Sequence, residues 1–250
     1  MKLRVDLNAD LGEGAAAERE LLDLVSSASI ACGFHAGDPA MMSTSILLAR
    51  QAGVAVGAHP SLADRENFGR KELPVTPDEV FALVAYQVGA FEGLARSLGV
   101  RPRHVKPHGA LYNMAVRDAA LAAAIARAVF ATDQSLTIFA PNDSRLAEAA
   151  AAAGLRVIHE VFADRNYLPD GTLVHRSRPD ALLHDPDAAA ERVLRMLREN
   201  RVRAIDGSDL PVTAETICIH GDNPAAVLFA KKLRENLVAA GIAVAAPGIR

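Results

Sequence analysis

The sequence repeats one unit along its length, in which a short apolar run rich in β-branched residues is followed by a longer segment with helical periodicity. The short runs have the length of buried strands, and the spacing between them suits crossover helices. Such alternation is typical of parallel strands joined by right-handed crossovers. The runs lie at residues 3–7, 29–32, 54–58, 104–106, 136–140, 155–159, 202–205, 216–220 and 242–245.

The number of runs favours a closed barrel. Seven to nine strand candidates in 250 residues predict an α/β fold with one TIM-like (β/α) barrel of seven or eight mostly parallel strands. An open doubly wound sheet stays possible, because alternation alone does not show closure. No linker or change of composition divides the chain, so we expect one domain over residues 1–250. In the irregular segment 163–185, Pro169-Asp170-Gly171 predicts a turn that closes a hairpin.

Several helix starts are marked by a capping side chain followed by proline, as in Asp38-Pro39, Asp185-Pro186 and Asn223-Pro224. The segment 76–79 has the same signal and also forms a capping box. Apolar residues then recur at helical spacing until Gly99, which we expect to end that helix.

Composition excludes several classes of protein. Lysine and arginine total 27 against 30 aspartate and glutamate, so the net charge is −3, and aromatic residues make up 4% of the chain. Neither a basic nor a stacking surface for nucleic acid or anionic membrane is expected. No apolar stretch approaches the roughly 18 residues of a membrane span, and Asp6 comes too early for a signal-peptide core. The only cysteines, Cys32 and Cys218, lack CxxC spacing and suit a reducing compartment. We therefore expect a cytoplasmic protein.

Polar residues gather where the predicted strands end. Side chains alternate between the two faces of a strand, so polar residues of one parity share a face. If the apolar faces pack on the helices, the opposite faces converge in the barrel mouth, where sites form in such folds. A single polar residue at a strand end is as often a structural tie or cap. A converging buried set is costly unless it holds a ligand. The set is Asp6, Asn8, Asp10, His35, His59, Lys106, His108, His220 and Asp222, with Glu160, Asp164 and Arg165 at the rim.

Standard nucleotide and nucleophile motifs are missing from the sequence. It contains no GxxxxGK[ST], GxGxxG, GxSxG or HExxH pattern. The loop 32–39 runs from a strand end into a capped helix, so its backbone N–H groups suit an anion, although alone it is an ordinary connecting loop. The metal question stays open. Asp10, His35, His59 and His220 have the residue types of a hydrolytic metal site, but their separation in sequence leaves their distances undetermined.

Six groups of residues, spread in order over nearly the whole chain, resemble the LamB/YcsF family. They are 6–14, 30–39, 57–61 with 64–70, 105–113, 160–165 and 217–224. The resemblance implies a barrel similar to those of glycoside hydrolases and deacetylases. It also implies a hydrolase acting on a cyclic amide, as the A subunit of a bacterial 5-oxoprolinase that cleaves 5-oxo-L-proline to L-glutamate with ATP hydrolysis. The expected partners are subunits B and C of that complex.

The substrate explains why ATP would be consumed. A five-membered lactam is an amide and resists attack by water, whereas phosphorylation of its oxygen makes a far better electrophile. Because the sequence has no P-loop, we expect the partner subunits to carry out the ATP step. This chain would then open the activated lactam.

The expected site has a catalytic and a substrate-binding set. The general base for water is Asp10 or Asp6, and Lys106 and His108 stabilise the developing oxyanion or phosphate. His35, His59 and His220 shuttle protons or bind the substrate carboxylate, with Asp222 orienting His220. The catalytic set is Asp6, Asp10, Lys106, His108, His220 and Asp222. The substrate-binding set is Asn8, His35, His59, Asn113, Glu160 and Arg165.

Three other interpretations remain. The chain could act alone as a metal-dependent amide or acetyl hydrolase on a deacetylase-like barrel. It could be a non-catalytic subunit that only presents the lactam to its partners. Lys106 could also act as a Schiff-base nucleophile, if it is desolvated and neutral.

Overall fold

Seven parallel strands close into a barrel in the computed structural model of the chain, which describes residues 3–219 and 225–248. The barrel strands are β1 (Arg4–Leu11), β2 (Ser27–Ala31), β3 (Ala55–His59), β4 (His104–Val105), β5 (Thr137–Ala140), β6 (Arg156–Phe162) and β9 (Thr216–Ile219). They pair in that order, and β9 pairs with β1 to complete the ring. The predicted closed barrel is confirmed, and the open sheet is wrong.

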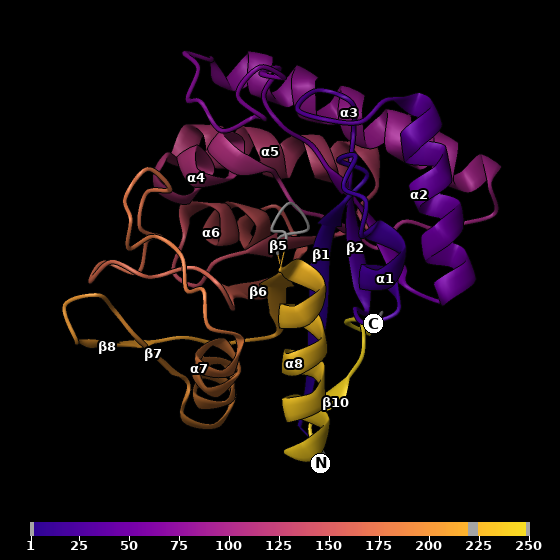
Figure 1. Cartoon of the computed structure of the whole chain (residues 1–250). Coiled ribbons are helices and arrows are strands. Elements are labelled where there is room, and N and C mark those ends of the chain that lie inside the picture. The colour runs from indigo at the N-terminus through magenta and orange to yellow at the C-terminus, as the bar shows by residue number, and fades with distance from the viewer. Residues whose placement is uncertain (1–2, 220–224, 249–250) are drawn as a thin grey trace.

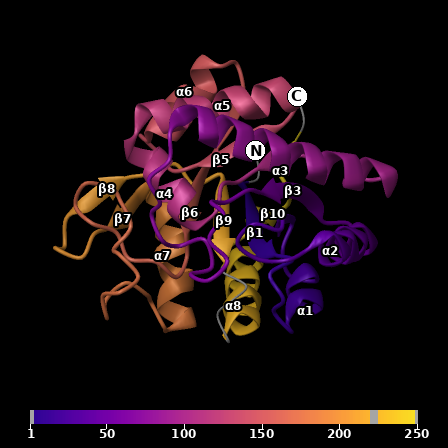
Figure 2. The same ribbon diagram turned by 90° about the horizontal axis from the view of Figure 1, so that it is seen from above.

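Helices cover the outside of the barrel. They are α1 (Glu18–Leu22), α2 (Pro39–Ala52), α3 (Pro77–Ser97), α4 (Gly109–Arg117), α5 (Ala119–Thr132), α6 (Arg145–Ala152), α7 (Pro186–Glu199) and α8 (Ala226–Ala239). Figure 1 shows the strands running through the middle of the molecule, with α8 in front and α3 and α5 behind. Seen from above, the helices form a ring around the strands (Figure 2). No helix within the described ranges is both long and apolar enough to cross a bilayer.

Two predicted strands lie outside the closed ring. The run 202–205 was expected among the alternating strands, but β7 (Arg201–Arg203) instead pairs antiparallel with β8 (Asp209–Pro211) at the edge of the molecule. The pattern of β7 explains the difference, because only Val202 is buried and both flanking arginines are exposed. A barrel strand is buried on both faces. The short β10 (Ala243–Val244) adds to the start of β1 in parallel.

The capping signals in the described residues form as predicted. Asp38 and Asp185 accept hydrogen bonds from the first turns of α2 and α7, and Thr76 forms the complete capping box of α3. Gly99 follows α3 with φ +72°, a left-handed conformation that favours glycine. The expected turn at 169–171 also forms, since the Leu168 N–H donates to the Thr172 carbonyl at 2.7 Å. The fourth signal, Asn223-Pro224, lies outside the described residues.

The barrel interior is polar toward the carboxyl ends of its strands. Val5, Leu7 and Ala9 of β1 are buried in the apolar core, as predicted for the outer face. Asn8, on the opposite face, donates to Glu160 of β6 at 3.0 Å. β9 is the one strand between β1 and β6 in the ring, so this bond spans β9 on the inner face of the barrel. The predicted parity is therefore correct.

Nearer the amino ends of the barrel strands, Gly57 leaves room for the buried ring of His104. A Cβ added at Gly57 would lie 2.3 Å from Cδ2 of His104. The His104 ring stacks on Phe139 with centroids 4.1 Å apart, and its Nε2 lies 3.0 Å from the Ser29 hydroxyl. Burial lowers the pKa of His104 to about 3, so the ring is neutral at ordinary pH.

Replacing Gly57 with alanine should lower the free energy of unfolding by about 1–3 kcal/mol, because the added methyl group would overlap the His104 ring, which is buried and stacked on Phe139. Denaturant unfolding measures this loss. Gly93→Ala is the matched control, since its Cβ would meet nothing within 4 Å on α3, and alanine favours a helix interior. In a His104→Ala background the Gly57→Ala cost should shrink. An equal cost in both backgrounds would contradict the steric explanation.

Candidate functional site

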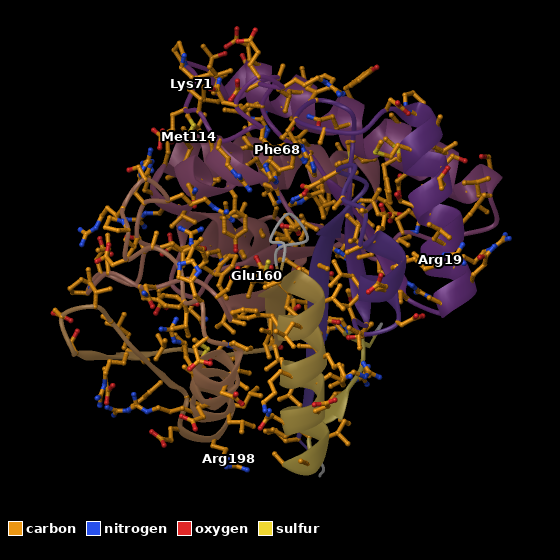
Figure 3. All side chains as sticks on the ribbon, in the orientation of Figure 1. Arg19, Phe68, Lys71, Met114, Glu160 and Arg198 are labelled. Carbon is orange, nitrogen blue, oxygen red and sulfur yellow. The ribbon has the colours of Figure 1, made fainter. Side chains whose placement is uncertain are left out.

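Side chains from the ends of β1, β3, β4 and β6, and from the loops that follow β1, β2 and β4, meet in two adjoining groups. The lysine cluster is Asn8, Asp10, Lys106 and Glu160, and the histidine cluster is Glu13, His35, His59 and His108. Figure 3 labels Glu160 and Phe68 near the middle of the view, while Arg19 and Arg198 lie near its edge.

The lysine cluster surrounds one buried ammonium group. Lys106 Nζ donates to Asp10 Oδ1 at 2.7 Å and to Asn8 Oδ1 at 3.0 Å. It also lies 3.0 Å from Glu160 Oε1, and Glu160 Oε2 accepts a 2.7 Å hydrogen bond from the Tyr112 hydroxyl. The lysine side chain is 3% exposed. Two carboxylates therefore share one cation away from bulk water.

The electrostatics keep Lys106 charged. Burial alone would lower its pKa, but the carboxylates of Asp10 and Glu160 hold the pKa of Lys106 well above its usual value. A Schiff-base nucleophile needs the neutral amine. With its protons directed at Asp10 and Asn8, Lys106 is an ammonium donor, and the Schiff-base interpretation loses its support.

The histidine cluster packs three imidazole rings around one carboxylate. Glu13 Oε1 lies 3.0 Å from His35 Nε2, 3.9 Å from His59 Nε2 and 3.6 Å from His108 Nδ1. The rings of His35 and His108 stack with centroids 3.8 Å apart. His59 connects the two clusters, because its Nε2 is 3.5 Å from Asp10 Oδ2.

Burial keeps two of these rings neutral. Desolvation, followed by the neighbouring His59, lowers the pKa of His35 to about 2. Desolvation and the two neighbouring histidines hold the pKa of His108 well below its usual value. The structure therefore gathers neutral imidazoles beside carboxylates, which are the donor types of metal ligands. The four ligand atoms lie within 4.8 Å of one another.

Asp6 lies deeper in the barrel and has its own partners. Its oxygens accept hydrogen bonds from Ser26 at 2.6 Å, Ser27 at 2.8 Å and Thr216 at 2.6 Å. Burial raises the pKa of Asp6 to about 6, despite these three hydroxyl donors. This geometry is that of a tie between β1, β2 and β9.

Other predicted residues lie apart from the two clusters. Asn113 is exposed on α4, where its carbonyl accepts from Arg117. Arg165 is buried after β6 and donates to the Val174 carbonyl at 2.6 Å. His220 and Asp222 lie outside the described residues. The metal ligands considered from the sequence were Asp10, His35, His59 and His220. The observed cluster keeps His35 and His59 and adds Glu13 and His108.

Glu13 and Tyr112 are the site residues that the sequence did not single out. Strand parity ends with β1 at Leu11, and Gly12 then turns the chain with φ +70°. After this turn Glu13 lies against the three histidines. Tyr112 adjoins the predicted Asn113, and helical geometry points the two side chains in different directions. Both residues lie in segments that carry the family resemblance, and that resemblance was the one feature of the sequence that could have identified them.

Comparison with known proteins identifies relatives over the whole length. The model of the LamB/YcsF family matches residues 5–248. A protein of Bacillus licheniformis, named as the A subunit of 5-oxoprolinase, is 50% identical over 97% of this chain and 98% of its own. The crystal structure of a lactam utilization protein from Thermus thermophilus has a TM-score of 0.92 and 46% identity, covering 98% of this chain and all of its own. A peptidoglycan deacetylase from Bacillus subtilis has a TM-score of 0.52 with 13% identity, covering 98% and 87%, and so shares the fold alone.

Proposed function

The chain belongs to the LamB/YcsF family, and we propose that it is the A subunit of an ATP-dependent 5-oxoprolinase that converts 5-oxo-L-proline to L-glutamate. The observation that carries this proposal is the 50% identity, over almost the full length of both chains, to a protein of that name. The buried charged site supports it, because opening a lactam needs a base and groups that stabilise a developing anion.

The ATP step belongs to the partner subunits B and C in this proposal. The 250 residues contain no P-loop motif. The clusters in the barrel mouth supply carboxylates, imidazoles and one ammonium group. Use of ATP and two free buried cysteines support a cytoplasmic location.

The reaction consumes two waters. Transfer of the terminal phosphoryl group of ATP to the lactam oxygen activates the ring carbon. A first water adds to this carbon as Asp10 accepts its proton, and the C–N bond then breaks as the nitrogen gains a proton. The resulting acyl phosphate is hydrolysed by a second water to glutamate and phosphate.

Asp10 is the better placed of the two predicted bases. Its Oδ1 is held by Lys106 and its Oδ2 faces the histidine cluster, whereas the oxygens of Asp6 accept three hydroxyl bonds. Lys106 orients Asp10 and adds positive charge to the site. The roles of His220, Asp222, Asn113 and Arg165 in binding or proton transfer stay predictions.

A stand-alone deacetylase is not favoured. The likeness to deacetylases is one of fold at 13% identity, while the relative at 50% identity carries the 5-oxoprolinase name. A purely presenting subunit is also a poorer match, since buried charges are costly in a protein that does no chemistry with them.

Reconstitution tests the proposed function. The chain is assayed with and without subunits B and C for 5-oxoproline-dependent ATP hydrolysis and glutamate release. We expect glutamate only when all three subunits and ATP are present. Glutamate formation by the chain alone with ATP would contradict the division of labour, and ATP-independent amide hydrolysis would favour the stand-alone alternative. Failure of the complete, folded mixture to release glutamate would refute the proposal.

A further inference from the structure

Two rings of the histidine cluster direct nitrogens at each other. His59 Nδ1 lies 2.6 Å from the Lys106 carbonyl oxygen, and His108 Nε2 lies 2.8 Å from the Phe68 carbonyl oxygen. A carbonyl oxygen only accepts, so each of these nitrogens carries a proton. The remaining nitrogens, His59 Nε2 and His108 Nδ1, face each other 2.9 Å apart.

A carboxylate lies beside the two facing nitrogens. Glu13 Oε1 is 3.9 Å from His59 Nε2 and 3.6 Å from His108 Nδ1. All three side chains are at least nine-tenths buried, so bulk water does not separate them. Two imidazole nitrogens and a carboxylate oxygen this close in a buried space repel one another unless a cation, either a proton or a metal ion, lies between them.

The spacing of the ligand atoms fits a metal ion. Bonds of 2.0–2.1 Å to zinc place the ligands of a tetrahedron about 3.4 Å apart. The three separations among Glu13 Oε1, His59 Nε2 and His108 Nδ1 are 2.9, 3.6 and 3.9 Å, which bracket that value. The carbonyl on the far nitrogen of His59 and of His108 is the outer contact that metal-binding histidines usually have.

From this geometry we propose that Glu13, His59 and His108 bind one divalent ion of the zinc class. The His35 ring lies parallel to that of His108, so its lone pairs do not point at the same ion, and its Nε2 contacts Glu13 instead. Two imidazoles and one carboxylate suit zinc and its first-row neighbours, whereas Mg²⁺ prefers a set of oxygens. The role of the ion rests on the proposed function. Its position beside Asp10 would place a positive charge where the oxygen of the opening lactam becomes anionic.

Metal binding is measured on the full-length chain without an affinity tag, after treatment with a chelator. Zn²⁺ is titrated by calorimetry, and Co²⁺ by its visible absorption. We expect one ion per chain and the intense Co²⁺ bands of a tetrahedral nitrogen and oxygen site. Titration with Mg²⁺ should give no comparable binding. No stoichiometric Zn²⁺ binding by the folded wild-type chain would overturn the proposal, whatever the variants do.

Substitutions then assign the ligands. His59→Gln, His108→Gln and Glu13→Gln should each weaken Zn²⁺ binding by more than the roughly 10- to 100-fold that loss of an outer contact costs. His184→Ala is the matched control, because His184 is exposed and outside the cluster. Unchanged affinity in the three cluster variants would place the ion elsewhere and overturn the assignment.

The two proposals can fail separately. A chain that binds no Zn²⁺ but releases glutamate with its partners overturns the metal site and leaves the function. A chain that binds one ion at the cluster but releases no glutamate in the complete mixture overturns the function and leaves the metal site.

Discussion

Lys106→Met should lower the free energy of unfolding by about 3–5 kcal/mol, as measured by denaturant unfolding of the isolated chain. Methionine has a similar length but no charge, so the carboxylates of Asp10 and Glu160 would remain buried without their shared cation. Asn8 would also lose the donor to its amide oxygen. Breaking a buried ion pair from one side costs more than the pair contributes, because a desolvated charge is left behind.

Two further variants separate this explanation from a loss of packing. Lys231→Met removes an exposed lysine and should change stability by no more than about 0.5 kcal/mol. Glu160→Gln added to Lys106→Met removes one uncompensated charge and should recover part of the loss. If the double variant is less stable than Lys106→Met alone, buried charge is not the cause.

The fold was predictable because its signals are local. Strand runs of β-branched residues and the caps at Asp38, Thr76 and Asp185 each act within a few residues of sequence. The error at 202–205 arose because a short apolar run does not reveal whether both faces are covered. Closure into seven strands depends on how β9 meets β1, which no local pattern encodes.

The candidate site was predictable in its residue types and only partly in its grouping. Parity correctly placed Asn8, Asp10 and Lys106 on one inward face. It also placed Asp6 there, but parity does not give depth, and Asp6 lies among hydroxyl groups below the cluster. Glu13 was not predicted as a site residue, because its position depends on a left-handed turn at Gly12, beyond the end of the strand.

His104 of β4 and His108 of the loop after it lie at different depths in the barrel. His104 shares the inward parity of Lys106 and His108, yet it fills the space beside Gly57 and stacks on Phe139. It is therefore a packing residue. Side chains two residues apart on a barrel strand occupy different layers, so only the upper layers reach the mouth where substrate would enter.

Asp10→Asn should reduce glutamate release by the reconstituted complex by about 10²- to 10⁴-fold, the range lost with a general base. The asparagine oxygen can still accept from Lys106 as Asp10 Oδ1 does, so the fold should persist. Phosphorylation of the lactam takes place on the partner subunits in the proposed mechanism. 5-Oxoproline-dependent ATP hydrolysis should therefore fall less than glutamate release. Both products are measured in the same reaction.

Two aspartates provide the comparison for Asp10. Asp23→Asn changes an exposed carboxylate at the other end of the barrel, after α1, and should leave both products unchanged. Asp6→Asn tests the second predicted base, and its three hydroxyl partners lead us to expect a loss mainly of stability. Normal glutamate release by Asp10→Asn, with a large loss in folded Asp6→Asn, would transfer the role of base to Asp6. The water to be activated would then lie below the lysine cluster, and the histidine cluster would be remote from the chemistry.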